Sequence, residues 1–535
     1  MNDRIKILRQ QSLDAINCIS AERAMLVTGF YNNPGVSGMP VPLQRAECFM
    51  HIMKNKKICI NPGELIVGER GPAPKATPTY PEICLHTLKD LDILDKREKV
   101  SFVVDETVRE AFRETIIPFW TGKTNRERIF SAMDREWIRA YQAGIFTEFQ
   151  EQRAPGHTVA GGKVFQKGMN DYIRECEDEI KKLSLLNEPE ITRKRQQLEA
   201  MVISAKAIIL FAERHAAFLE EMATSGTDLQ RKKELSMMAD ICRKVPAEAP
   251  ETFHEALQHY WFLHLGVITE LNPWDSFSPG RLDRHLYPFY KKDIEAERLT
   301  PAMAKELLQA FWIKFNNHPA PPKVGVTAKE SNTYTDFTLI NLGGLTAEGE
   351  DAVNDLTYLV LDVIEVMRLL QPGTMIQVSR KNPDRFIERA LKIIETGFGQ
   401  PSVFNTDAII SELLWQGKAI EDARNGGCSG CVETGAFGTE SYTLTGYFNL
   451  PKILEITLNN GLDPATGLLT GIETGDPLSF NSIDDIISAF RNQLEYFAGI
   501  KIRGNNRIEK IYAGHLPVPF LSLLIDDCIC KGTDY

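Results

Sequence analysis

The pattern of apolar and polar positions divides the chain into a helical part and an alternating part. From about residue 104 to 245, apolar residues recur at helical spacing, and a long stretch such as 198–222 buries one stripe and exposes the other. Further along, helical patterns alternate with short apolar runs, in the order 351–369 (helix), 375–378 (strand), 384–396 (helix), 402–405 (strand) and 407–416 (helix). This order predicts parallel strands joined by crossover helices, and hence an α/β fold.

Several shorter elements are also predicted. Thr300-Pro301 marks a helix start, with Thr as the N-cap and Pro in the first turn, and the helix should run to about residue 317. The apolar run at 63–69, between glycines, is typical of a buried strand, and 323–327 is predicted as another strand. We expect the long apolar run at 516–524 to form a strand as well.

A short stretch from Gly427 to Gly435 concentrates unusual chemistry. It contains Cys428, Cys431 and Glu433 among three glycines, a composition that neither a helix nor a strand favours. Because Cys431 and Glu433 are one residue apart, their side chains face the same way if the loop is extended. From the residues alone, a structural glycine loop, a redox pair or half of a zinc site all remain open, although the chain offers no second ligand pair at a convincing spacing.

Composition and charge argue against several classes of protein. Charged residues make up 25% and hydrophobic residues 43% of the chain, the mixture of a soluble globular protein. The net charge of −11 and the lack of a basic stripe argue against nucleic acid as a partner. No apolar run reaches the roughly 18 residues of a membrane span, and the first residues lack the apolar core of a signal peptide. The ten cysteines are scattered, so we expect a cytoplasmic protein without disulfides.

The segment Gly430-Cys431-Val432-Glu433 resembles the cysteine loop of the glycyl radical enzymes, the family of pyruvate formate-lyase and the cobalamin-independent diol dehydratases. The longer run 429–435, followed by Phe437-Gly438 and by Leu444-Thr445-Gly446-Tyr447, is most similar to the hydroxyproline dehydratases of that family. The resemblance extends over residues 1–535 and implies one pyruvate formate-lyase-type domain. It implies an α/β barrel with many surrounding helices.

The resemblance also implies a reaction and a set of site residues. Cys431 would abstract a hydrogen atom as a thiyl radical, and Glu433 would act as general acid or base for the leaving hydroxyl. The implied reaction removes water from trans-4-hydroxy-L-proline to give a pyrroline carboxylate. The positions that match the family's substrate pocket are Phe149, His157, Asp275, Ser331, Asp336, Phe337 and Tyr447. By themselves these residues leave plainer interpretations open, because a lone loop His is more often structural and a loop Asp usually forms a turn.

The chain departs from the family pattern on its C-terminal side. Glycyl radical enzymes store their radical on a glycine in a motif like Arg-Val-x-Gly-Tyr, and no such motif occurs in the 535 residues. We therefore expect an incomplete barrel, without the glycyl radical domain, that is inactive by itself. The resemblance implies that an AdoMet-dependent iron–sulfur activating enzyme installs the glycyl radical. It further implies a homodimer that acts on a small molecule, with no metal and no tightly bound cofactor.

Two other functions stay open. The first is a glycyl radical enzyme for another substrate, such as a diol dehydratase or a C–C or C–S lyase, because the cysteine loop is common to all of these. The second is a catalytically inactive fragment or partner subunit that lacks the radical glycine. The role of Cys428 is open as well.

Overall fold

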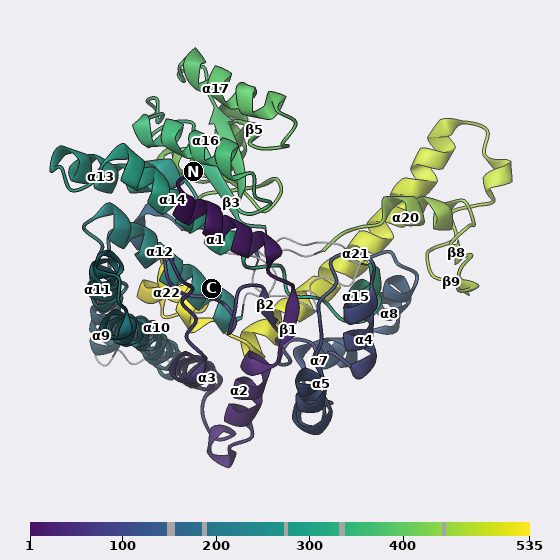
Figure 1. The fold of residues 1–535 in the computed structure, drawn as a ribbon. Coiled ribbons are helices and arrows are strands. Elements are labelled where there is room, and N and C mark those ends of the chain that lie inside the picture. The colour runs from purple at the N-terminus through teal and green to yellow at the C-terminus, as the bar shows by residue number, and fades with distance from the viewer. Residues whose placement is uncertain (147–155, 184–189, 272–276, 331–336, 441–445) are drawn as a thin grey trace.

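The computed structural model describes residues 1–146, 156–183, 190–271, 277–330, 337–440 and 446–535. Helices dominate these residues (Figure 1). Those of the first half are α1 (Asp3–Asp14), α2 (Glu22–Tyr31), α3 (Val41–Asn55), α4 (Leu88–Lys96), α5 (Glu106–Ala111), α6 (Ile117–Trp120), α7 (Asn125–Ala132), α8 (Arg135–Gln142), α9 (Met169–Leu183), α10 (Ile191–Ser225), α11 (Leu229–Lys244) and α12 (Phe253–Glu270). Those of the second half are α13 (Leu282–Glu295), α14 (Pro301–Asn316), α15 (Val326–Glu330), α16 (Asp355–Met367), α17 (Asp384–Glu395), α18 (Thr406–Trp415), α19 (Ile420–Asn425), α20 (Leu450–Thr457), α21 (Ile483–His515), α22 (Pro519–Leu524) and α23 (Cys528–Lys531).

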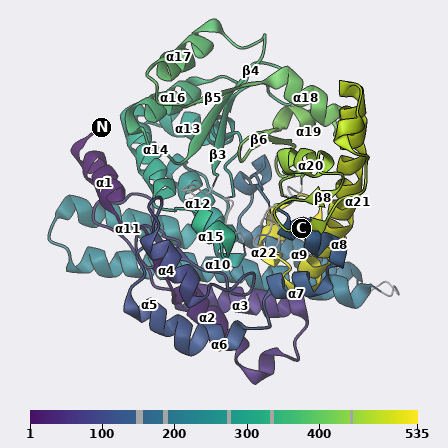
Figure 2. The same cartoon turned by 90° about the vertical axis from the view of Figure 1, so that its right-hand side faces the viewer.

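The strands are short and form small sheets. They are β1 (Cys18–Ser20), β2 (Ala76–Pro78), β3 (Leu339–Gly343), β4 (Gly373–Val378), β5 (Ser402–Asn405), β6 (Gly427–Ser429), β7 (Glu433–Gly435), β8 (Leu462–Asp463) and β9 (Leu468–Leu469). The predicted alternation of helix and strand is confirmed, since β3, β4 and β5 lie side by side and parallel, with α16 and α17 as the crossovers between them (Figure 2).

Two isolated bridges extend this sheet beyond β3. Gly280 pairs in parallel with Ile340 of β3, and Ser278 pairs in parallel with Val159. The backbone bonds are regular, because the N–H of Asn341 donates to the C=O of Gly280 at 2.9 Å. A row of parallel segments therefore runs from 158–160 through 278–280 to β3, β4 and β5.

The helical core centres on α12, which the rest of the chain surrounds. The side chain of Thr252 caps the helix by accepting from the N–H of Glu255, and nearly all of its residues are buried. The predicted helix at Thr300 is confirmed as α14, whose N-cap hydroxyl accepts from the N–H of Met303. Aromatic side chains join the two helices, with ring centroids of Trp261 and Phe315 5.0 Å apart at 82°.

The predicted strand at 63–69 is wrong, because these residues have no backbone partner in a ladder in the described structure. Leu65 to Val67 are buried, but a side chain takes the place of a second strand. The amide of Gln258 accepts from the N–H of Val67 at 2.8 Å and donates to its C=O at 2.9 Å. One glutamine thus satisfies the backbone groups that a neighbouring strand would otherwise bind.

The strands predicted at 323–327 and 516–524 are also wrong. Gly325 adopts φ +68° directly before α15, which takes up the second half of the predicted strand. The apolar run at 516–524 contains α22, whose residues are all buried, and a helix that is apolar all round has the same composition as a buried strand. The carboxylate of Glu270 accepts from the N–H groups of Phe520 and Leu521, so it satisfies the first turn of this helix.

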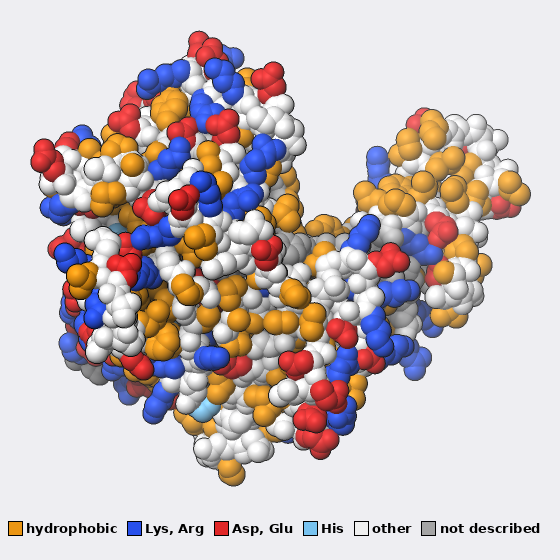
Figure 3. All heavy atoms as spheres, in the orientation of Figure 1, with side chains coloured by type: hydrophobic (Ala, Val, Ile, Leu, Met, Phe, Trp, Pro, Cys, Tyr) orange, Lys and Arg blue, Asp and Glu red, His pale blue; other side chains and the backbone are white. Residues whose placement is uncertain are grey.

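An arm formed by α20, β8, β9 and the first part of α21 stands away from the body (Figures 1 and 3). The later part of α21 is tied to α8, where Arg503 pairs with Glu136 at 3.0 Å. The arm carries exposed apolar side chains, such as Ile483 and Leu478. Among the described helices, none combines the length and the apolar character needed to cross a membrane.

Candidate active site

The cysteine-bearing stretch is a β-hairpin rather than the irregular loop that its glycines indicated. Strands β6 and β7 pair antiparallel, with Cys428 opposite Thr434 and Ser429 opposite Glu433. The turn consists of residues 430–432 and begins with Gly430 at φ +55°, a backbone conformation that suits glycine. The hairpin therefore presents Cys431 at its tip, where the residue is exposed.

The Glu433 carboxylate binds the backbone of this turn. Its Oε2 accepts from the backbone N–H of Cys431 at 2.8 Å and from that of Val432 at 3.0 Å. The carboxylate of Glu433 is therefore linked to Cys431 through the backbone of the turn, and the side-by-side placement of its thiol and the carboxylate stays a prediction. These two bonds hold one carboxylate oxygen, Oε2, on the turn.

His157 supplies the third group of this cluster. Its Nε2 lies 3.7 Å from Oε1 of Glu433, and only 4% of its surface is exposed. The ring packs edge-on against Phe337, with centroids 5.5 Å apart at 67°. A Cβ atom on Gly430 would lie 2.5 Å from Cδ2 of His157 and 2.7 Å from Oε2 of Glu433. Only a glycine fits at this position of the turn.

The parallel sheet explains why residues so far apart in the chain meet here. His157 directly precedes the segment 158–160, and Phe337 lies two residues before β3. Since these segments run in the same direction, the residues that precede them lie at one edge of the sheet. Phe337 itself adopts φ +56°, an uncommon and strained conformation for a bulky residue.

Four of the predicted pocket residues, Phe149, Asp275, Ser331 and Asp336, lie outside the described residues. The structure therefore brings together Cys431, Glu433, His157 and Phe337 from the predicted set. Tyr447 is described and is 61% exposed, next to Phe448, which forms an antiparallel bridge with Phe146.

Cys428 has a structural role. Its side chain is fully buried among Leu339, Met375 and Leu413, and burial raises the pKa of its thiol to about 12. A thiol that stays protonated is a poor nucleophile and metal ligand. Among the described residues, no group of three or more His, Cys, Asp and Glu side chains is placed to hold a metal.

Two residues that contact the hairpin had not been singled out from the sequence. Asn341 of β3 and Gln377 of β4 are both buried, and their amides bind the backbone of residues 426–428. A signal for them exists in the sequence, since each is a lone amide within an apolar strand, where an unpaired polar group would be costly.

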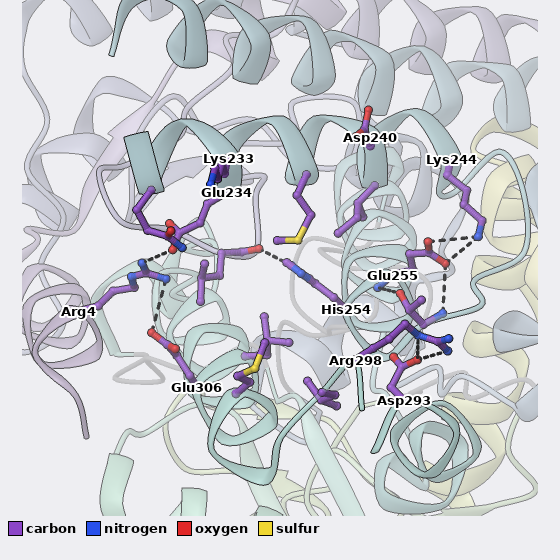
Figure 4. Close-up of a pocket in the computed structure, with 18 residues that line it drawn as sticks. Arg4, Lys233, Glu234, Asp240, Lys244, His254, Glu255, Asp293, Arg298 and Glu306 are labelled. Atoms are coloured by element: carbon purple, nitrogen blue, oxygen red, sulfur yellow. Dashed lines mark hydrogen bonds and ion pairs between the residues drawn. The ribbon is translucent and has the colours of Figure 1, made fainter. Parts of the chain in front are cut away.

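A separate cavity of about 600 Å³ lies among α1, α11, α12, α13 and α14 (Figure 4). Several of its charged side chains pair with one another, as Arg4 does with Glu234 at 2.6 Å and Arg298 with Asp293 at 2.7 Å. Nε2 of His254 donates to the C=O of Leu65 at 2.7 Å, and burial lowers the pKa of this histidine. No residue of the hairpin lines this cavity, so it does not belong to the thiol site.

The family model described as pyruvate formate lyase-like matches residues 1–535. The chain belongs to this family. It is 51% identical over 533 residues to a trans-4-hydroxy-L-proline dehydratase from Clostridioides difficile, a match that covers 100% of this chain and 67% of that protein. It is 30% identical to a (2S)-3-sulfopropanediol dehydratase from Klebsiella oxytoca, over 99% of this chain and 65% of the relative.

Solved structures of pyruvate formate lyase-like enzymes agree with the fold. A crystal structure of the C. difficile hydroxyproline dehydratase with bound trans-4-hydroxy-L-proline superposes with a TM-score of 0.97 at 50% identity, over 100% of this chain and 67% of that one. The glycerol-bound B12-independent glycerol dehydratase from Clostridium butyricum gives a TM-score of 0.94 at 33% identity, with the same coverage. The expected glycyl radical enzyme fold is confirmed, and the chain spans about two thirds of the length of these relatives.

Proposed function

We propose that this chain carries the thiol and acid/base groups of a glycyl radical dehydratase that removes water from trans-4-hydroxy-L-proline, giving a pyrroline carboxylate. The observation that carries the proposal is the convergence of Cys431, Glu433 and His157 at the hairpin tip. The 51% identity to a hydroxyproline dehydratase supports the choice of substrate over the sulfopropanediol and glycerol on which less similar relatives act.

The C–H bond beside the ring nitrogen of hydroxyproline is not acidic, so a base alone cannot start the reaction. The radical supplied on activation provides the one-electron chemistry that protein side chains lack. Cys431 then takes a hydrogen atom from this ring carbon, and it later returns one to the neighbouring carbon. Its place at the exposed tip of the turn lets both the radical source and the substrate reach the sulfur.

Loss of the hydroxyl requires that the C–O bond breaks while the oxygen gains a proton. Oε1 of Glu433 and Nε2 of His157 are 3.7 Å apart, too far for a good direct hydrogen bond but close enough for a hydroxyl oxygen to bridge them. We assign proton donation to Glu433 and orientation of the hydroxyl to His157. The ring nitrogen loses a proton as the imine forms, so the substrate yields one water and one pyrroline carboxylate.

The remaining roles follow from side-chain chemistry. Asp275 and Asp336 suit the ring ammonium and Ser331 suits the carboxylate, while Phe149, Phe337 and Tyr447 suit the walls of an apolar pocket. The proposal also includes an AdoMet-dependent iron–sulfur activating enzyme as a partner, a cytoplasmic homodimer, and no metal or other bound cofactor.

The proposal is tested with the complete, activated protein under anaerobic conditions, using hydroxyproline, glycerol and 1,2-propanediol as substrates. We expect turnover of hydroxyproline and of neither glycerol nor 1,2-propanediol. Turnover of one of these two alcohols in place of hydroxyproline would refute the substrate assignment. In deuterated water, Glu433→Gln should still introduce deuterium into recovered hydroxyproline while product formation is lost, because abstraction survives without the acid. Cys431→Ser should show neither deuterium incorporation nor product formation. Full dehydration by Glu433→Gln would refute the role of the Glu433 carboxylate as the acid.

A further inference from the structure

The edge of β6 that faces away from β7 forms hydrogen bonds with side chains. Along a strand of an antiparallel pair, the N–H and C=O of successive residues point alternately toward the partner strand and away from it. The N–H and C=O of Cys428 point away from β7, because both bind a side chain on the other edge of β6. The side chain of Asn341 takes both groups. Its Oδ1 accepts from the N–H of Cys428 at 3.0 Å, and its Nδ2 donates to the C=O of Cys428 at 2.9 Å.

Three carbonyl groups, spaced two residues apart, are bound in this way. Arg281 donates to the C=O of Arg424 at 3.0 Å, and Gln377 donates to the C=O of Gly426 at 3.0 Å. Asn341 binds the third carbonyl, that of residue 428. Gln377 also donates to Oδ1 of Asn341 at 3.2 Å, so the two amides form one buried unit.

This pattern decides how the hairpin lies on the sheet. Within the described part of the chain, β6 has a backbone ladder only with β7, and none with β3 or β4. The distance between β6 and these two strands is therefore set by the side-chain amides of Asn341 and Gln377. Both are almost fully buried, at 0% and 1% exposure, so water does not compete for these bonds.

The glycines next to Cys428 allow the close contact. A Cβ atom on Gly427 would lie 2.2 Å from Oδ1 of Asn341 and 2.4 Å from Nε2 of Gln377. A Cβ atom on Gly426 would lie 2.5 Å from the C=O of Gly435. At Gly427 the strand rests directly on the amide pair, so any side chain there would displace it, whereas a side chain at Gly426 would collide with the backbone of β7.

We propose that Asn341 and Gln377 are positioning residues that set the place of the Cys431 sulfur and the Glu433 carboxylate through the backbone of β6. The proposal rests on the proposed function. The turn begins two residues after Cys428, and Glu433 is paired with Ser429, so a tilt of β6 moves both reactive groups together. Neither amide contacts the reacting atoms, and a shift of about 1 Å in such a site can cost on the order of 100-fold in rate.

The first test uses near-isosteric variants, Asn341→Leu and Gln377→Met, in the complete, activated protein. Each is expected to lower kcat by roughly 10- to 100-fold with KM for hydroxyproline changed less than about threefold. The matched control is Gln258→Met, because Gln258 makes the same pair of bonds to one buried residue, Val67, away from the hairpin. A kcat within twofold of the parent for both amide variants, or an equal loss in the control, would overturn the proposal.

The second test does not depend on the reaction. Hydrogen exchange at the Cys428 amide should become at least tenfold faster in Asn341→Leu and stay unchanged in Gln258→Met. Alkylation of Cys431, measured by mass spectrometry against the exposed Cys530 in the same molecule, should change in rate in Asn341→Leu only. Unchanged hydrogen exchange and unchanged alkylation would overturn the positioning proposal. If the parent protein dehydrates no hydroxyproline, the proposed substrate is refuted, but the exchange and alkylation results still test the positioning role.

Discussion

Replacing Gly430 by alanine would place a methyl group between the two side chains that flank the turn. The new Cβ would lie 2.5 Å from Cδ2 of His157, 2.6 Å from its Nε2 and 2.7 Å from Oε2 of Glu433. Contacts this short do not persist, so the imidazole or the carboxylate must move by roughly 1 Å. His157 is buried, and Glu433 is held by two backbone N–H groups, so both movements break existing contacts.

Two terms contribute to the expected loss of stability in Gly430→Ala. The left-handed backbone at φ +55° costs a non-glycine residue about 1–2 kcal/mol. Overpacking against His157 and Glu433 adds about 1–3 kcal/mol. Because the carboxylate and imidazole are displaced, we expect kcat to fall by about 100-fold or more.

Gly417 offers a matched control for the backbone term. It has φ +88°, but a Cβ there would meet nothing within 4 Å. Gly417→Ala should lose only the backbone term in urea unfolding and should keep the kcat of the parent. If Gly430→Ala and Gly417→Ala show the same stability and the same kcat in the activated protein, the close packing of His157, Gly430 and Glu433 is not required for turnover.

Two further predictions concern groups outside the turn. Because burial raises the pKa of Cys428 to about 12, this thiol should resist alkylation at pH 8 while Cys431 reacts, and rapid labelling of Cys428 in folded protein would contradict this. The variant Cys428→Ala should keep kcat within twofold of the parent, because Asn341 binds only the backbone of residue 428. Burial also lowers the pKa of His259 from 6.5 to about 4. At this site the unfolded chain therefore binds more protons between these pH values, and His259 should contribute a fall in the free energy of unfolding of up to about 1.4 kcal/mol per pH unit on acidification. His259→Gln should flatten this slope in urea titrations at pH 7 and 5, and an unchanged slope would contradict the assignment.

Local features were predictable because neighbouring residues carry them. The N-cap at Thr300, the alternation that forms β4 and β5, and the adjacency of Cys431 and Glu433 all follow from spacing along the chain. Resemblance to the family added His157 and Phe337, which no periodicity identifies. The glycines around Cys428 did not reveal that the amides of Asn341 and Gln377 approach the backbone there.

Apolar patterning by itself indicated that segments such as 63–69 and 516–524 contribute to the core, and the alternation of helix and strand indicated that β4 and β5 run parallel. It did not determine what satisfies the buried backbone, because burial looks the same in sequence whether the partner is a strand, a helix turn or one amide. Val67 bonded by Gln258 shows this, and so does Cys428 bonded by Asn341, 87 residues away. Only the folded chain decides such long-range pairings, since they depend on where distant elements pack rather than on the preferences of adjacent residues.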